Sequence, residues 1–182
     1  MKLKSSYILA AVLTMPILLF AQRDNYYFGA GLGTGNIKSN SPSQTSLSGT
    51  IIIGIDNALG TEIGIRSSYV IARKVNYFLP ENSAGKYYPF VQCFSLNAVL
   101  NQPLNGRMFT EQLIGIVLLN DRTFSDINKW DYGITFSVLL GWDLRDNNRE
   151  GFKIGIAGDA ALTFTSTNAS YYIISFKALY YL

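Results

Sequence analysis

The stretch FGAGLGTGN, residues 28–36, has the glycine content of a loop that binds a phosphate group. Loops of that kind follow G-x-G-x-x-G or G-x-x-x-x-G-K-S/T, because each glycine has a set place around the phosphates. This stretch meets neither pattern, and its glycines stand at every second position: Gly29, Gly31, Gly33 and Gly35. A period of two is the period of a β-strand. We therefore interpret it as a strand with one face free of side chains.

Nucleophilic and metal chemistry is limited by what the chain lacks. It contains no histidine and one cysteine, Cys93. Ser-His and Cys-His catalysis need an imidazole base, and many metal sites need an imidazole ligand, so these classes are excluded. We expect Cys93 to be a small buried side chain, and we expect no cofactor and no metal. An enzyme would need a histidine-free mechanism built on acidic residues, so we predict that the protein is not an enzyme.

Charged side chains remain as candidates for functional residues, and their spacing decides whether they could act together in acid–base catalysis or form ion pairs. Asp131 and Asp143 are twelve residues apart, too far for joint acid–base catalysis in a strand. Glu62 and Arg66 are about 13 Å apart at strand rise, so each should meet partners on neighbouring strands. The charged residues at the polar positions of alternating segments are Asp56, Glu62, Arg66, Arg107, Glu111, Asp131, Asp143, Lys153, Asp159 and Lys177. Enclosed charges must pair or meet water, so we interpret them as a salt-bridge network, with a conduction path as the alternative.

The elements that position these charges are long alternating strands. In WDYGITFSVLLGWDL, residues 130–144, every even position is apolar or aromatic, far beyond the usual strand length of five or six residues. From Trp130 to Trp142 such a strand, tilted by about 40°, rises about 30 Å, which matches a bilayer core. With the glycine strand, the following segments bring the count to eight: SLSGTIIIGID, TEIGIRSSYVI, FVQCFSLNAVL, MFTEQLIGIVLL, FKIGIAGDAALTF and YYIISFKALYYL.

Connections between these segments alternate in length. DNALG, NQPLNG and RDNNREG are short turns, whereas 37–46, 73–89 and 120–129 are longer polar stretches, with a shorter one near 166–170. This is the layout of an outer-membrane barrel, which has turns in the periplasm and loops outside. The longest loop mixes cations with aromatics, and its candidate binding residues are Arg73, Lys74, Tyr77, Phe78, Lys86, Tyr87 and Tyr88. They would bind a protein, a glycan or lipopolysaccharide, or simply extend the barrel wall above the membrane.

The residue types indicate which face points inward. A soluble barrel would hide its apolar face and expose a face rich in Lys and Glu. Here the polar face is mostly Gly, Ser, Thr and Ala, which suits a narrow lumen, and the apolar face ends in aromatics, as a lipid-facing band does. We predict an all-β, eight-stranded, antiparallel up-and-down transmembrane β-barrel. The glycine stripe then makes room for the inward side chains of the last strand, such as Tyr171, Lys177 and Tyr181.

The first residues are interpreted as a leader for export. Lys2 and Lys4 precede an apolar run over 7–20, and Ala21 stands at the expected cleavage site. We therefore assign 1–21 as a signal peptide and 22–182 as the barrel domain. Without the leader the chain is close to neutral, which gives no electrostatic reason to bind nucleic acid.

Over residues 22–182 the pattern resembles the small eight-stranded outer-membrane barrels, the OmpA/OmpX-like group and the "outer membrane protein beta-barrel domain" of Bacteroidota. The C-terminal FKALYYL resembles the signal read by the barrel insertion machinery: Phe176 and Tyr180 keep its aromatic spacing, while Leu182 replaces the usual final Phe. The resemblance implies an outer-membrane location among lipid and lipopolysaccharide, and a structural role or an interaction with a protein partner through extracellular loops. The alternatives are a narrow transporter or porin-like pore for small or apolar molecules, and a subunit of an envelope secretion complex.

Overall fold

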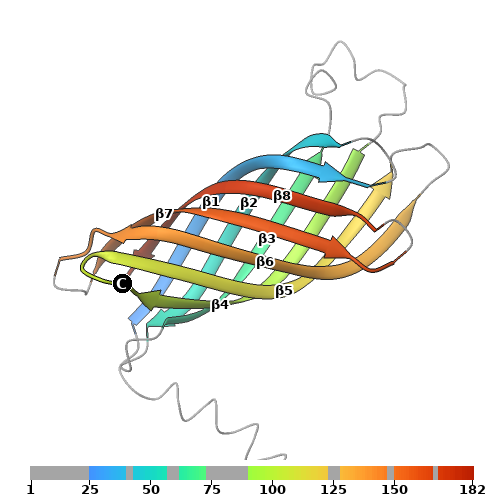
Figure 1. The fold of residues 1–182 in the computed structure, drawn as a ribbon. Coiled ribbons are helices and arrows are strands. Elements are labelled where there is room, and N and C mark those ends of the chain that lie inside the picture. The colour runs from blue at the N-terminus through green and yellow to red at the C-terminus, as the bar shows by residue number, and fades with distance from the viewer. Residues whose placement is uncertain are drawn as a thin grey trace, which may run out of the picture.

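The computed structural model describes residues 25–39, 43–56, 62–72, 90–122, 128–146, 150–165 and 168–182. These residues form a closed barrel in which each strand pairs antiparallel with the next and β8 pairs with β1 (Figure 1). The strands are β1 Asn25–Lys38, β2 Gln44–Asp56, β3 Glu62–Ala72, β4 Phe90–Pro103, β5 Met108–Arg122, β6 Lys129–Asp143, β7 Gly151–Thr163 and β8 Ser170–Tyr181. The predicted fold class is confirmed. In this part of the chain there is no helix with the length and apolar character to cross a membrane.

The register of the sheet makes the barrel narrow. The stagger is found by starting at Gly29 on β1 and moving from each residue to its cross-strand partner on the next strand. After one circuit of the barrel this path reaches Tyr171 on β8, whose partner on β1 is Ile37. The stagger of the sheet around the barrel is therefore eight residues, the separation of Gly29 and Ile37 along β1. Eight strands staggered by eight residues tilt by about 36°, and the interior is just wide enough for side chains to fill.

The glycine stripe of β1 lies against the inward side chains of β8. A Cβ added to Gly31 would sit 2.6 Å from Oγ1 of Thr50 and 2.8 Å from Cγ of Lys177. A Cβ on Gly33 would sit 2.6 Å from Oγ of Ser48. These distances are shorter than van der Waals contact, so the lumen beside β1 is already occupied by its neighbours. The glycines of β1 therefore leave space in the lumen for the inward side chains of the neighbouring strands β2 and β8.

The outer face is a continuous apolar belt. Leucines, isoleucines and valines in the middle of the strands are exposed, among them Leu32 at 77% and Ile51 at 64%. Exposed aromatics mark the two ends of the belt, including Trp142 and Phe152 at one end and Trp130 at the other. An apolar band bordered by aromatic rings is typical of a barrel wall in contact with lipid.

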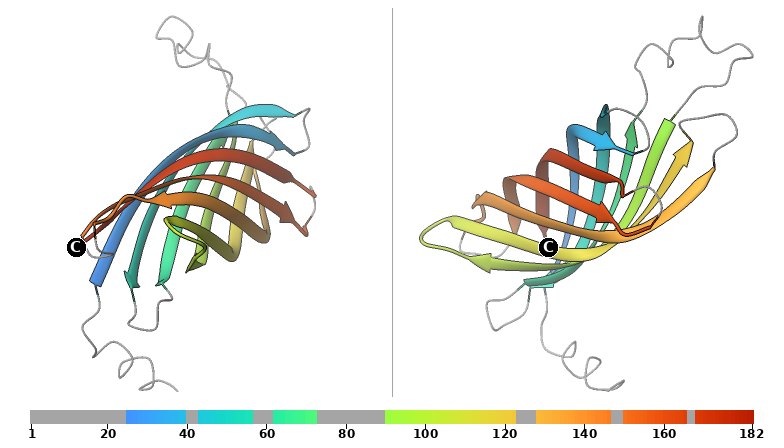
Figure 2. Two further views of the ribbon diagram at one scale, coloured as in Figure 1. Left: turned by 60° about the vertical axis from the view of Figure 1, so that its left-hand side comes forward. Right: turned by 45° about the vertical axis from the view of Figure 1, so that its right-hand side comes forward.

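The two ends of the barrel differ in their connections. The first residue of β1 and the last of β8 lie at the same end, as Figure 2 shows, and an up-and-down topology places the β2–β3, β4–β5 and β6–β7 turns there too. We call this the terminal end. The opposite end, which carries the β1–β2, β3–β4, β5–β6 and β7–β8 connections, is called the loop end.

Candidate functional site: the charged interior of the barrel

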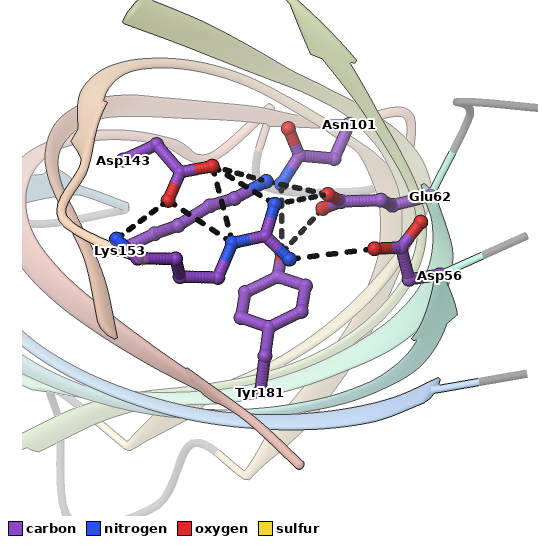
Figure 3. Close-up of polar contacts among 7 residues, drawn as sticks. Asp56, Glu62, Asn101, Asp143, Lys153 and Tyr181 are labelled. Atoms are coloured by element: carbon purple, nitrogen blue, oxygen red, sulfur yellow. Dashed lines mark hydrogen bonds and ion pairs between the residues drawn. The ribbon is translucent and has the colours of Figure 1, made fainter. Parts of the chain in front are cut away.

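At the terminal end, the interior holds an arginine enclosed by three carboxylates. Arg145 follows β6, and its guanidinium lies 2.8 Å from Oδ2 of Asp143, 3.3 Å from Oδ2 of Asp56 and 3.6 Å from Oε1 of Glu62. The carboxylates come from the end of β2, the start of β3 and the end of β6. Barrel closure brings these three strand ends together, so the guanidinium contacts carboxylates from three strands. Figure 3 shows Asp56, Glu62 and Asp143 pointing into the same part of the lumen.

Aromatic rings and a second cation complete this cluster. Cζ of Arg145 lies 4.1 Å from the centre of the Tyr181 ring, and Nζ of Lys153 lies 4.7 Å from it. Lys153 also donates to Glu62, as does the Tyr181 hydroxyl, and Tyr181 stacks on Tyr27 with ring centres 4.9 Å apart. We call this set the terminal layer: Asp56, Glu62, Asn101, Asp143, Arg145, Lys153 and Tyr181.

The environment keeps Arg145 protonated. Burial alone would lower the pKa of its guanidinium, since the charged form loses contact with water. Hydrogen bonds and attraction from Asp143, together with the charge of Glu62, outweigh that effect and raise the pKa above its ordinary value. The terminal layer therefore holds a permanent cation, which suits a structural plug rather than a proton donor.

Deeper in the lumen, two further ion pairs form a middle layer. Nη2 of Arg66 lies 2.6 Å from Oδ1 of Asp159, and Nζ of Lys177 lies 3.1 Å from Oε1 of Glu111. Lys177 and Glu111 have no solvent-exposed side-chain surface, and Arg66 is 1% exposed. Ser175 donates to Asp159 at 2.9 Å, which fills another acceptor position. Because every cation here has a carboxylate partner, the layer is a paired plug.

Beyond the middle layer the lumen becomes apolar and then polar again at the loop end. A buried cluster that includes Val70, Cys93, Leu119 and Tyr171 fills the section toward the loops. Above it, Ser39 donates to Asp121. In the same region Thr165 donates to Asp131 at 2.6 Å. The interior thus alternates ionic, apolar and polar sections along its axis.

Comparison with known proteins identifies the architecture. No protein-family model and no curated protein sequence matches the chain. Among solved structures, neisserial surface protein A matches with a TM-score of 0.57 at 12% identity, over 85% of this chain and 96% of that one. The Ail attachment invasion locus protein of Yersinia pestis, in complex with the heparin analogue sucrose octasulfate, matches with a TM-score of 0.58 at 10% identity, over 87% and 99%. The protein has the fold of a small eight-stranded outer-membrane β-barrel. At these identities the likeness concerns the fold alone.

Most of the barrel's predicted inward charges lie in the lumen, in separate groups. Asp56, Glu62, Asp143 and Lys153 meet in the terminal layer, and Arg66, Glu111, Asp159 and Lys177 meet in the middle layer. Asp131 is buried near the loop end, away from both layers. Ion pairing across the barrel, rather than along one strand, explains why Glu62 and Arg66 do not pair with each other.

Arg107 was expected on the inner face, and that expectation is wrong. The β4–β5 hairpin turns at residues 104–107, so β5 begins at Met108 and Arg107 is exposed in the turn. The alternation that places Glu111 inward does not extend to Arg107, because the strand begins only at Met108.

Sequence reasoning missed Arg145, because it assigns RDNNREG as a short turn and names no residue of that turn as a candidate for the interior. A signal was present: Asp56, Glu62 and Asp143 put three acids at the terminal end, and Lys153 alone could not balance them. A cation within reach of that end was therefore required, and the residue two positions after Asp143 supplies it.

Some of the remaining candidates lie on the outer face, and the others lie outside the described residues. The residues of the C-terminal signal, Phe176, Tyr180 and Leu182, are exposed on the outer face of β8 and directly after it. The loop candidates Arg73, Lys74, Tyr77, Phe78, Lys86, Tyr87 and Tyr88 lie outside the described residues, as does the signal peptide over 1–21.

Proposed function

We propose that the protein is an integral outer-membrane barrel with a lumen closed by its own side chains, which serves the envelope as a membrane-anchored scaffold and interaction module. The observation that carries the proposal is the inversion of the usual soluble pattern. Large apolar side chains such as Leu32 and Ile156 are exposed, while charged ones such as Lys177 and Glu111 are buried. Such a surface is stable in lipid, and in such an interior the buried cations Arg66 and Lys177 pair with carboxylates.

A closed lumen argues against the pore alternative. The terminal layer, the middle layer and the apolar cluster lie in succession along the axis, and an ion would have to separate salt bridges in two of them. Breaking a buried pair leaves an uncompensated charge in a low-dielectric interior, which is strongly unfavourable. Interaction at the surface is therefore favoured over transport through the lumen.

Export and insertion follow from the ends of the chain. The leader over 1–21 directs the chain through the inner membrane, and the outward aromatics Phe176 and Tyr180 of β8 are presented to the insertion machinery. In the membrane, the apolar belt contacts lipid in one leaflet and lipopolysaccharide in the other. The loop end then faces outward and the terminal end faces the periplasm.

The loop end is the proposed interaction surface. Ail, which shares this fold, was crystallised with a heparin analogue, a polyanion. The longest loop of this chain carries the cations Arg73, Lys74 and Lys86 among tyrosines, which suits an anionic glycan or the phosphates of lipopolysaccharide.

Replacing these three cations with serine should weaken retention on immobilised heparin and leave the barrel folded, as judged by heat-modifiable mobility. Equal retention of variant and parent would contradict this role for the loop.

Conductance in planar lipid bilayers tests the closed lumen. We expect no stable, reproducible openings from the purified, refolded barrel. A porin of known conductance in the same bilayers is the positive control. Reproducible unitary steps would contradict the closed lumen and favour the transporter alternative.

Extraction from the native outer membrane in mild detergent, followed by sizing, separates a free barrel from a subunit of a secretion complex, since the latter would bring a stoichiometric partner.

A further inference from the structure

Four buried hydroxyls on the inner wall of β2 and β3 have no hydrogen-bonding partner among the described residues. Three of them follow one another on the inner face of β2: Ser46, Ser48 and Thr50. The fourth belongs to Ser68, the cross-strand partner of Thr50 on β3. We call these four residues, which are at most 8% exposed, the hydroxyl seam. A buried hydroxyl without a partner is unfavourable, so the seam requires an explanation.

Buried serines and threonines elsewhere in the described chain are bonded within the protein. They are Ser39, Ser95, Thr110, Thr135, Ser137, Thr163 and Ser175. The hydroxyl of Tyr27 also lacks a partner, but Tyr27 pairs with Gly54, which lies beyond Ile52 from the seam. Unpaired serine and threonine hydroxyls are therefore confined to one side of the described lumen.

The seam lies beside the bare face of β1. The β1 partners of Thr50 and Ser48 are Gly31 and Gly33. Oγ1 of Thr50 and Oγ of Ser48 each lie 2.6 Å from the place that a Cβ would take on the partner glycine, so both hydroxyls lean toward the glycine stripe. No residue of β2, which the structure describes in full, belongs to the buried apolar cluster of this section. This side of the lumen is thus lined by small and polar groups, as sites of ordered buried water are.

At its inner end the seam reaches a buried ion pair. Arg66 precedes Ser68 on the inner face of β3. Its Nη2 pairs with Oδ1 of Asp159 at 2.6 Å, and its Nη1 donates to Ser137 at 3.4 Å. Nε of Arg66 is buried and has no partner in the described part of the chain. A guanidinium donor therefore points to the same missing partner as the hydroxyls.

The two ends of the seam differ in their access to solvent. Beyond Thr50, the next inward residue of β2 is Ile52, which is 0% exposed and belongs to a second buried apolar cluster. Beyond Ser46, the next inward residue is Gln44, which is partly exposed at the loop end. The seam is therefore open toward the loops and closed toward the terminal layer.

We propose that ordered water molecules form a blind column along the inner wall of β1, β2 and β3, which enters at the loop end and ends at the guanidinium of Arg66. Successive seam residues of β2 are about 6.6 Å apart at strand rise, and a water bonded to two hydroxyls spans about 5.6 Å, so one or two waters complete each step. Water at this place offsets part of the cost of burying the pair Arg66–Asp159. The closed end keeps the lumen impassable to ions, so the column goes beyond the proposed function without opening a pore.

A crystal structure of the refolded barrel, at a resolution that shows ordered water, tests the column directly. We expect solvent oxygens within hydrogen-bonding distance of Oγ1 of Thr50, Oγ of Ser68 and Nε of Arg66. Thr50→Val should lose the oxygen beside position 50, whereas the matched variant Thr50→Ser, which keeps a hydroxyl, should retain it. A seam without solvent oxygens in the parent protein would overturn the proposal.

The sign of a stability change gives a second test. Valine has nearly the shape of threonine, so Thr50→Val removes the hydroxyl and little else. If that hydroxyl bonds to water, its loss should shift the urea midpoint of unfolding to a lower concentration, whereas loss of an unpaired hydroxyl would shift it to a higher one. Heat-modifiable mobility shows that the variant is folded. A midpoint at or above that of the parent would overturn the column and leave the closed lumen standing, since conductance tests the lumen separately.

Discussion

Arg145 is the residue on which the terminal layer depends, since its guanidinium pairs with three carboxylates contributed by different strands. We predict that Arg145→Ala lowers the free energy of unfolding by about 3 kcal/mol, the usual cost of leaving buried charges without their partner. Urea titration of the refolded barrel in lipid vesicles measures the change. Arg107→Ala is the matched control, because Arg107 is an exposed arginine in a turn at the same end of the barrel. Equal stability of the two variants would show that Arg145 is not needed for the layer.

The pair Lys177–Glu111 allows a sharper test, because neither side chain has exposed surface. Lys177→Met alone leaves Glu111 charged and unpaired, and should destabilise the barrel by about 3 kcal/mol. The double variant Lys177→Met with Glu111→Leu removes both charges, so it should recover most of that loss. Unfolding free energies of the parent, both single variants and the double variant give the coupling between the two positions. Additive losses would contradict a direct ionic coupling.

At the scale of elements, β1 shows how a bare strand face serves the barrel. A Cβ at Gly31 would lie within 2.6 Å of Thr50 and 2.8 Å of Lys177, whereas a Cβ at Gly49, on the outer face of β2, would meet nothing within 4 Å. Gly31→Leu should therefore impair folding into detergent micelles, and Gly49→Leu should not. The folded fraction is read from heat-modifiable mobility. Normal folding of Gly31→Leu would show that the lumen beside β1 can expand.

For the molecule as a whole, the two tryptophans report where the membrane lies. Trp130 and Trp142 are both exposed on the outer face, at the start and near the end of β6. We predict that lipids brominated near the headgroup quench their fluorescence more than lipids brominated near the chain ends, since each ring lies at a border of the belt. Tryptophan-to-phenylalanine variants, one at a time, separate the two signals. Stronger quenching from the bilayer centre would place the belt at another depth.

The sequence alone was enough to predict the architecture and the side of each residue. A strand places alternate side chains on opposite faces, so the pattern of Trp130–Leu144 and its counterparts determined which residues face lipid before any pairing was known. The bare face of β1 could be predicted for the same reason. Local periodicity carries this information because it depends only on neighbours along the chain.

Only the tertiary structure decided which charges meet. Glu62 pairs with Lys153 and Arg145 rather than with Arg66, because ion pairs form across a closed lumen between strands distant in sequence. The stagger of the sheet sets the level of each residue, and no single strand contains that stagger. The alternating pattern also did not predict where each strand ends. Arg107 fits the alternation of the following strand, but it lies in the β4–β5 turn, because β5 begins at Met108. Arg145 shows the opposite behaviour. It lies in a turn by sequence, yet its side chain lies in the lumen because the carboxylates there require a cation.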